Sequence, residues 1–144
     1  MSNADNPING AMFQDSVCAW FEKEYGKRFI QEMKIAIGFD QSNLKEHKFD
    51  IVAEDRSMAI ECKRYTWTET GNVPSAKMGF TNEAAFYLSF LPDSYEKYIV
   101  MLYSYNVKRH ETLAEYYYRT NSHLLRNTKV AEYNPEAEGL RIIG

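Results

Sequence analysis

Residues 48–64 read KFDIVAEDRSMAIECKR, and this stretch decides the fold that the sequence predicts. Apolar and polar residues alternate on both sides of a short charged turn, which is typical of two half-buried strands joined as an antiparallel hairpin. Facing residues in such a pair point to the same side of the sheet. Pairing Ile51 with Ile60 puts the apolar side chains on one face, and a shift by one residue would expose them. The other apolar partners in this register are Phe49 with Cys62 and Ala53 with Met58.

The opposite face of the predicted hairpin carries charged residues. Asp50 lies opposite Glu61, and Lys63 follows two residues later on the same face. Like charges in direct cross-strand opposition destabilise a sheet, and a divalent cation between two carboxylates removes that repulsion. The pattern therefore favours a metal site. The alternative is a solvated sheet face whose charges have no function, since charged outer faces are common.

The spacing Asp50-x₁₀-Glu61-x-Lys63 on a hairpin resembles the motif of the PD-(D/E)xK nuclease superfamily, which has the restriction-endonuclease-like fold. Phe49 stands where the motif is named for proline. The resemblance implies that Asp50 and Glu61 bind Mg²⁺ (or Mn²⁺), with the backbone carbonyl of Cys62 completing the protein ligands. It also implies that Lys63 orients or helps to deprotonate the attacking water. The expected activity is Mg-dependent hydrolysis of DNA phosphodiester bonds.

Residues 10–25 are predicted to form an amphipathic helix, because large apolar side chains recur there at intervals of three to four residues. The superfamily usually carries an acidic residue early in this helix, just after an aromatic one. Gln14 stands at that point, after Phe13, and is expected to hold a water molecule of the site. Asp15 and Glu22 remain the alternatives on the same helix.

The rest of the chain completes an α/β (α+β) pattern. The predicted elements are a strand at 29–38, the hairpin, a helix at 81–91 with Thr81 as its N-cap, a buried strand at 98–105, a helix at 111–126, and short strands at 128–133 and 140–143. This order, αβββαβαβ, predicts a central mixed β-sheet flanked by helices. It agrees with the core topology of the restriction-endonuclease-like fold.

Positive charge is concentrated after the hairpin, although the formal net charge of the chain is −3. One face of the predicted helix 111–126 combines basic and aromatic side chains at steps of three and four residues, a combination that suits a phosphate backbone. The residues of this face are Tyr116, Arg119, His123 and Arg126. Its predicted core stripe is Leu113, Tyr117, Thr120 and Leu124. Lys77 is a further candidate for a phosphate contact.

Two residues near the hairpin each have two interpretations. His47 is close in sequence to Asp50 and could reach a substrate, whereas a lone histidine in a loop is more often simply exposed. Trp67 lies in a polar segment at residues 65–75. It is either a base-stacking residue or a plug that packs onto the body of the protein.

The 144 residues are expected to form one domain. Residues 1–9 are interpreted as a tag remnant or a disordered N-terminus, and residues 10–144 as a single nuclease-like domain. No apolar run approaches the ~20 residues of a membrane-spanning helix, and no signal-peptide pattern is present. Cys18 and Cys62 are expected to be buried reduced thiols, so the sequence favours a cytoplasmic protein.

The expected partner is DNA, and a homodimer is a further expectation because related folds often dimerise to cut two strands. Two alternatives share the fold: a catalytically inactive nucleic-acid-binding module, favoured by the absence of the helix carboxylate, and an RNA-processing nuclease. A third is an unrelated α/β protein whose hairpin charges are incidental. Neither the structure of the substrate nor the choice between endo- and exonuclease follows from the sequence.

Overall fold

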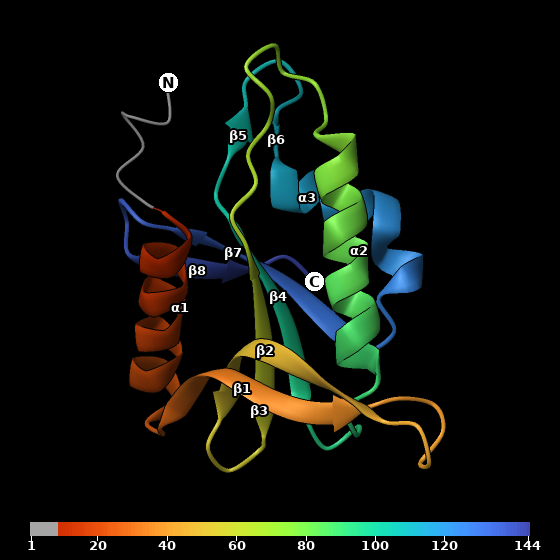
Figure 1. Ribbon diagram of the computed structural model, residues 1–144. Helices are drawn as coiled ribbons and strands as arrows, with labels where there is room; N and C mark the ends of the chain where they lie inside the picture. The colour runs from red at the N-terminus through yellow and green to blue at the C-terminus, as the bar shows by residue number, and fades with distance from the viewer. Residues whose placement is uncertain (1–8) are drawn as a thin grey trace.

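The computed structural model describes residues 9–144 and contains a six-stranded sheet with helices on both faces (Figure 1). Except for Asn9, the residues interpreted as a tag or disordered N-terminus lie outside the described part of the chain. The elements are α1 (Gly10–Tyr25), β1 (Phe29–Ile37), β2 (Lys45–Ala53), β3 (Met58–Lys63), α2 (Ser75–Ser89), β4 (Glu96–Leu102), β5 (Tyr105–Asn106), β6 (Glu111–Thr112), α3 (Leu113–Asn121), the 3₁₀ turn η2 (Ser122–Leu124), β7 (Thr128–Asn134) and β8 (Gly139–Ile142).

The main sheet is mixed and has the strand order β1-β2-β3-β4-β7-β8. Strands β3, β4 and β7 run parallel, while β1–β2, β2–β3 and β7–β8 are antiparallel pairs. The predicted mixed sheet flanked by helices is confirmed. Because the three central strands are parallel, they end at one edge of the sheet, which we call the carboxyl edge.

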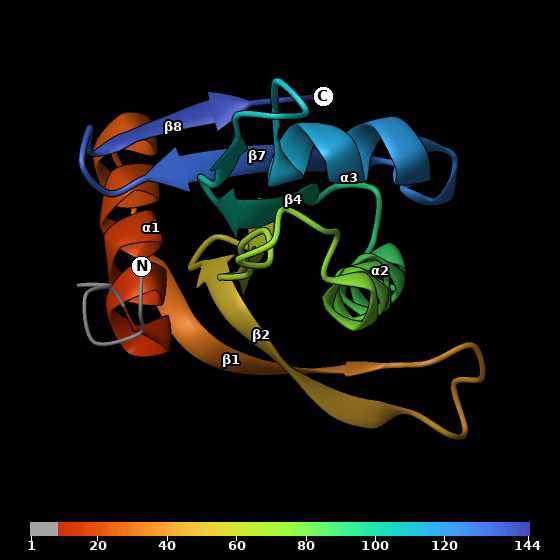
Figure 2. The ribbon, with the colours of Figure 1, turned by 90° about the horizontal axis from the view of Figure 1, so that it is seen from above.

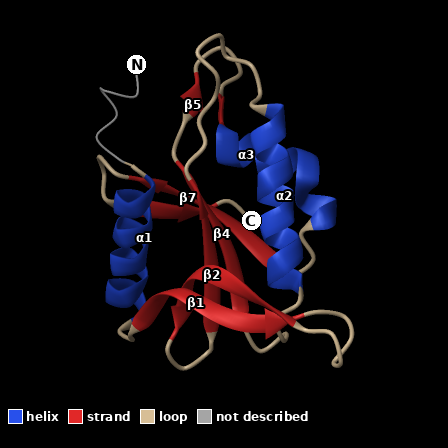
Figure 3. Cartoon of the chain, in the orientation of Figure 1, coloured by secondary structure: helices blue, strands red, loops and turns tan. Residues whose placement is uncertain are grey.

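Helix α1 lies on one face of the sheet and helices α2 and α3 on the other (Figures 2 and 3). An apolar core lies on each of these two faces. Helix α1 covers one face, where Phe13, Val17 and Phe21 are completely buried against β2, β3 and β4. Helices α2 and α3 cover the other face, where Leu88 and Tyr117 are buried. We call these the α1-side core and the α2-side core. Burial of each large side chain contributes about 1.5–3 kcal/mol.

Helix α1 has the predicted bounds, and its ends show why. The side chain of Asn9 accepts a hydrogen bond from the backbone N–H of Met12, which caps the first turn. Gly26 ends the helix with φ 62°, a left-handed conformation that glycine adopts without a steric penalty. Asn9 therefore belongs to the fold rather than to the excluded N-terminus.

Helix α2 begins at Ser75, six residues before the predicted start, and the prediction of Thr81 as its N-cap is wrong. Thr81 lies inside the helix, where its hydroxyl donates a hydrogen bond to the carbonyl oxygen of Lys77 at 3.0 Å. The overlooked indicator is Pro74, because proline is well tolerated where a helix begins.

Helix α3 is shorter than predicted, extending from Leu113 to Asn121 before the chain tightens into η2. Arg126 has φ 45°, so it lies outside any helix. Leu124 is 55% exposed, and its assignment to the core stripe is wrong. The start is fixed by a capping box in which Thr112 and Glu115 satisfy each other's backbone N–H groups. The sequence also missed the small hairpin β5–β6 just before this helix.

The predicted register of the β2–β3 hairpin is confirmed where the strands pair, since Ile51 faces Ile60 and Val52 faces Ala59. The predicted pairs Phe49–Cys62 and Asp50–Glu61 lie beyond this pairing. One part of the prediction is wrong. Phe49 packs in the α2-side core, whereas Ile51 packs in the α1-side core, so the two side chains do not share a face. The regular alternation is interrupted at Asp50, which lies between them.

Candidate active site

Strands β1 and β2 interrupt their pairing at Glu32 and Asp50, two residues that would otherwise face each other. The pairs on either side are Gln31 with Ile51 and Met33 with Phe49. Glu32 has φ 57°, a conformation that costs on the order of 1–3 kcal/mol for a residue with a side chain. On the two sides of this interruption, alternate side chains of each strand point to opposite faces of the sheet. Asp50 lies at the point of change and therefore does not follow the in-and-out alternation of the strand.

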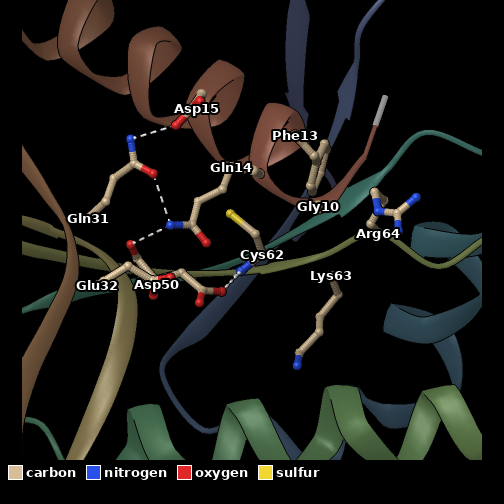
Figure 4. A pocket seen from close by; sticks show the side chains of 11 residues that line it. Gly10, Phe13, Gln14, Asp15, Gln31, Glu32, Asp50, Cys62, Lys63 and Arg64 are labelled. Atoms are coloured by element: carbon tan, nitrogen blue, oxygen red, sulfur yellow. Dashed lines mark hydrogen bonds between the residues drawn. The ribbon is translucent and has the colours of Figure 1, made fainter. Parts of the chain in front are cut away.

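An open cavity of about 440 Å³ lies at this interruption, between the first turns of α1 and the end of β3 (Figure 4). Gln14 and Asp15 line it from α1, and Asp50 lines it from β2. Lys63 and Arg64 line it from the end of β3. The cavity thus opens at the carboxyl edge, the side on which α/β proteins commonly bind ligands.

The carboxylate of Asp50 is held at the end of β3. Its Oδ2 accepts a hydrogen bond from the backbone N–H of Cys62 at 2.7 Å. This bond takes the place of a regular ladder bond beyond the last β2–β3 pair. The hairpin sequence predicted that Asp50 and Glu61 would be close, and their side chains are adjacent.

Glu61 is buried, with 5% of its surface exposed, and it does not line the cavity. Its Oε1 lies 2.9 Å from Nε2 of His47, and its Oε2 accepts a hydrogen bond from the backbone N–H of Asp50 at 3.4 Å. Burial raises the pKa of Glu61 well above its ordinary value and is the largest cause of this shift. The negative charge of Asp50 and a hydrogen bond with the Asp50 side chain raise it further. Burial and the adjacent carboxylate therefore favour the protonated form of Glu61.

His47 holds Glu61 from the β2 side. Its ring stacks on Tyr87 of α2 with centroids 3.9 Å apart, and it contacts the edge of Phe49. Burial lowers the pKa of His47, so the imidazole is a neutral partner rather than a permanent cation. Within residues 9–144, Asp50 and Glu61 form no salt bridge with a lysine or an arginine.

Lys63 is half-buried and shares the cavity with Asp50, and its side chain extends toward helix α2 in Figure 4. Its charge is one of the influences that lower the pKa of Glu61. The three residues of the predicted motif are therefore gathered at the end of β3. Asp50 and Lys63 line the cavity, whereas Glu61 does not.

The side chain of Gln14 contacts this cluster at the backbone of Asp50. Its Nε2 donates to the carbonyl oxygen of Asp50 at 3.3 Å and to Oε1 of Gln31 at 2.9 Å (Figure 4). Gln31 in turn donates to Asp15 at 3.0 Å. Glu22 is directed elsewhere, because its carboxylate accepts from the backbone N–H of Phe29 at the turn after α1. Of the three helix candidates, Gln14 and Asp15 line the cavity.

The donor set fits a hard divalent cation with few protein ligands. Mg²⁺ is usually bound through one or two carboxylates plus waters and substrate phosphates, and Asp50 and Glu61 supply two adjacent carboxylates. Burial is the main cause of the raised pKa of Glu61, and a cation would offset the second cause, repulsion by the Asp50 carboxylate. The described residues contain no group of three or more His, Cys, Asp and Glu side chains arranged for a metal. A metal at this site would need further ligands, and the resemblance implies the backbone carbonyl of Cys62, with waters and phosphate oxygens as the remainder.

The predicted nucleic-acid residues do not form one face. Arg119 pairs with Glu111 at 2.9 Å, while His123 and Arg126 are exposed beyond the end of α3. Lys77 is at the start of α2, with its ammonium group 5.3 Å from the centre of the Tyr65 ring. The predicted single stripe is wrong because the helix ends too early to align all four residues.

Trp67 is a plug. It is 8% exposed, its indole N–H donates to the carbonyl oxygen of Ser104 at 3.0 Å, and Tyr116 packs edge-on against it. The sequence overlooked the contact between His47 and Glu61, because their separation of 14 residues gives no local pattern. It also overlooked Gln31, Glu32 and Arg64 in the cavity. Of these, Arg64 follows Lys63 directly and could have been found from its position.

Cys18 is buried and Cys62 is partly buried, and neither forms a disulfide. Burial raises the pKa of the Cys18 thiol to about 11 and that of Cys62 well above its ordinary value, so both thiols stay protonated. No helix within residues 9–144 is long and apolar enough to cross a membrane.

Comparison of the chain with protein-family models, with curated proteins and with solved structures found no match. A functional interpretation therefore depends on the geometry and chemistry of the site itself.

Proposed function

We propose that this protein is a metal-dependent nuclease that hydrolyses DNA phosphodiester bonds. The observation that carries the proposal is a pair of adjacent carboxylates, Asp50 and Glu61, next to Lys63 at an open cavity. No lysine or arginine of the described residues neutralises either carboxylate through a salt bridge. The element order α1-β1-β2-β3-α2-β4 and the mixed sheet support a relationship to the PD-(D/E)xK superfamily.

Each residue has a role in this proposal. Asp50, Glu61 and the backbone carbonyl of Cys62 would hold Mg²⁺ or Mn²⁺. Such an ion supplies a Lewis acid that lowers the pKa of a water molecule and offsets negative charge on the phosphate. Lys63 donates hydrogen bonds to a phosphate oxygen and stabilises the charge that develops in the transition state. Gln14 holds the backbone of Asp50 in position through its bond to the carbonyl oxygen.

Two observations favour a second candidate, a nucleic-acid-binding module of the same fold without turnover. Both carboxylate oxygens of Glu61 already have partners in the protein, and Glu61 does not line the cavity. The helix position at which a carboxylate was expected holds Gln14. Such a module would bind DNA equally well in EDTA and in Mg²⁺. A nuclease would cleave DNA only when the metal is present.

A panel of labelled DNA and RNA substrates in Mg²⁺ or Mn²⁺ tests the proposal. We expect cleavage of DNA, and a decrease of roughly 10³-fold in Lys63→Ala because a single group that stabilises the transition state contributes that much. Glu61→Ala should be equally inactive. Lys129→Ala, which removes an exposed lysine near the start of β7, is the matched control and should cleave normally.

Cleavage by Lys63→Ala at the wild-type rate would overturn the assignment of this residue. Cleavage of RNA in preference to DNA would favour an RNA-processing nuclease. Metal-independent binding without any cleavage would favour the inactive module.

A further inference from the structure

Two segments that are far apart in the sequence project together from the carboxyl edge (Figure 1). Residues 64–74 follow β3, and residues 103–112 follow β4 and contain the β5–β6 hairpin. The backbone N–H of Trp67 donates to Oγ of Ser104 at 3.2 Å, and the indole N–H donates to the Ser104 carbonyl oxygen. These two hydrogen bonds fix one segment against the other. We call the two segments together the projection.

Asn106 organises the outer part of the projection. It is buried, and its side-chain amide donates to the carbonyl oxygen of Gly71 at 3.0 Å. Its Oδ1 accepts from the backbone N–H of Arg109 at 3.1 Å, and its carbonyl oxygen accepts from His110 at 2.8 Å. The turn that carries Lys108, Arg109 and His110 is therefore held in a defined shape while all three side chains are exposed.

No ion pair among residues 9–144 neutralises Lys108 or Arg109 of this turn. The Arg109 guanidinium lies 5.2 Å from the centre of the Trp67 ring and 5.8 Å from that of Tyr116, so aromatic rings hold it in place. Within residues 9–144 neither Lys108 nor Arg109 forms a salt bridge, in contrast to Arg119 with its partner Glu111.

A cavity of about 290 Å³ lies between the two segments of the projection. Lys108 and the exposed ring of Tyr105 line it on one side, and Glu69, Thr70 and Gly71 line it on the other, so the charge of Lys108 is offset within the cavity by Glu69. Exposed cations beside an aromatic ring are the combination with which proteins hold single-stranded nucleic acid, since the cations bind phosphates and every base can stack on a ring. Lys108 and Arg109 of the turn supply the cations, and Tyr105 supplies the ring.

We propose that the projection is a second binding site, one that holds a single-stranded segment of DNA continuous with the strand in the active-site cavity. Lys108 and Arg109 bind its phosphates, and Tyr105 stacks on one of its bases. The inference rests on the proposed function, because the nuclease site supplies the substrate class. Both sites lie at the carboxyl edge, and one segment of the projection, residues 64–74, begins directly at the end of β3.

Fluorescence anisotropy with a short labelled single-stranded oligonucleotide in EDTA tests this proposal without cleavage. We expect Lys108→Ala/Arg109→Ala to bind roughly tenfold more weakly, with a log–log salt dependence shallower by about 1.4, or about 0.7 per lost phosphate contact. Lys23→Ala/Arg28→Ala is the matched control. It removes the same charge from exposed residues near the end of α1 and the start of β1, and it should bind as the wild type does.

Tyr105 provides an independent variant. Tyr105→Ala should weaken binding about fivefold or more, and Tyr105→Phe should restore it, because the ring rather than the hydroxyl stacks on a base. Cooperative urea unfolding with the m-value of the wild type would show that each variant stays folded.

The outcomes separate this inference from the proposed function. Wild-type affinity in both Lys108→Ala/Arg109→Ala and Tyr105→Ala would overturn the inference while cleavage by the wild type left the proposed function standing. Weakened binding by these variants, in a protein that cleaves nothing in any metal, would support the projection as a binding site and reject the nuclease. A loss of affinity equal to that of Lys23→Ala/Arg28→Ala would also overturn the inference, since it would reflect net charge alone.

Discussion

Glu61 on β3 and Glu132 on β7 are both buried carboxylates, with 5% and 4% of their surfaces exposed, yet their partners differ. Arg141 donates to Oε2 of Glu132 through two nitrogens at 3.0 and 2.8 Å. It also pairs with Glu115 at 3.1 Å. The hydrogen-bond partners of Glu61 are a neutral histidine and the backbone of Asp50, whose negative charge is adjacent.

This difference separates a structural carboxylate from a candidate functional one. A buried charge is costly unless a counterion lies beside it, and Arg141 provides that counterion permanently. Glu61 must take up either a proton or a cation from solution. Burial alone therefore does not make Glu61 a candidate for a functional site, whereas burial without a permanent counterion does.

The largest expected effect concerns Glu132, the buried carboxylate with a permanent counterion. Arg141→Met should lower the free energy of unfolding by about 3 kcal/mol, because it leaves Glu132 buried without its cation. Urea denaturation with an unchanged m-value would measure this loss. Arg28→Met, which breaks an exposed pair with Glu54, should cost no more than about 1 kcal/mol. Equal losses in the two variants would mean that Glu132 does not depend on its partner.

The second effect concerns Glu61, the buried carboxylate without a permanent counterion, and is measured by adding and removing metal. Mn²⁺ at about 100 times its dissociation constant should raise the free energy of unfolding by about 2.7 kcal/mol, and EDTA should reverse this gain. Glu61→Gln should lose the stabilisation, since it removes a ligand, while Glu132→Gln should keep it. The same increase in Glu61→Gln as in the wild type would place the metal elsewhere.

The smallest effect concerns His47, which positions the Glu61 carboxylate. Removing a residue that orients a metal ligand typically weakens metal binding by about tenfold, and we expect this for His47→Ala by calorimetry with Mn²⁺. His47→Gln should recover most of the affinity, because its amide can still hydrogen-bond to the carboxylate. If both variants bound Mn²⁺ equally weakly, the ring packing against Tyr87 rather than the hydrogen bond would be responsible.

Local patterns in the sequence predicted some features correctly. The alternation around Ile51 and Ile60 gave the hairpin register, because a one-residue shift would expose the apolar side chains. The apolar spacing and Gly26 gave both ends of α1. Asp50, Lys63 and Gln14 were singled out in sequence, and all three line the same cavity.

Other features depend on pairing between distant segments. A period of two assigns Phe49 and Ile51 to one face, but the interruption at Glu32 and Asp50 sends them to different cores. No local pattern can show this, because it is decided by how β1 pairs with β2. The bonds from Asn106 to Gly71 and from Trp67 to Ser104 likewise join segments more than 30 residues apart, as their separations of 35 and 37 show.

The sequence by itself determined which side chains alternate, where α1 begins and ends, and that Asp50 and Glu61 would be near each other. Only the tertiary structure decided that Glu61 is buried with His47 as its partner, and that Lys108 and Arg109 stand on a projection above the same sheet edge. The physical reason is that periodicity reports which residues avoid water along one strand or helix. Counterions, cavities and facing surfaces arise from contacts between elements that are distant in the chain.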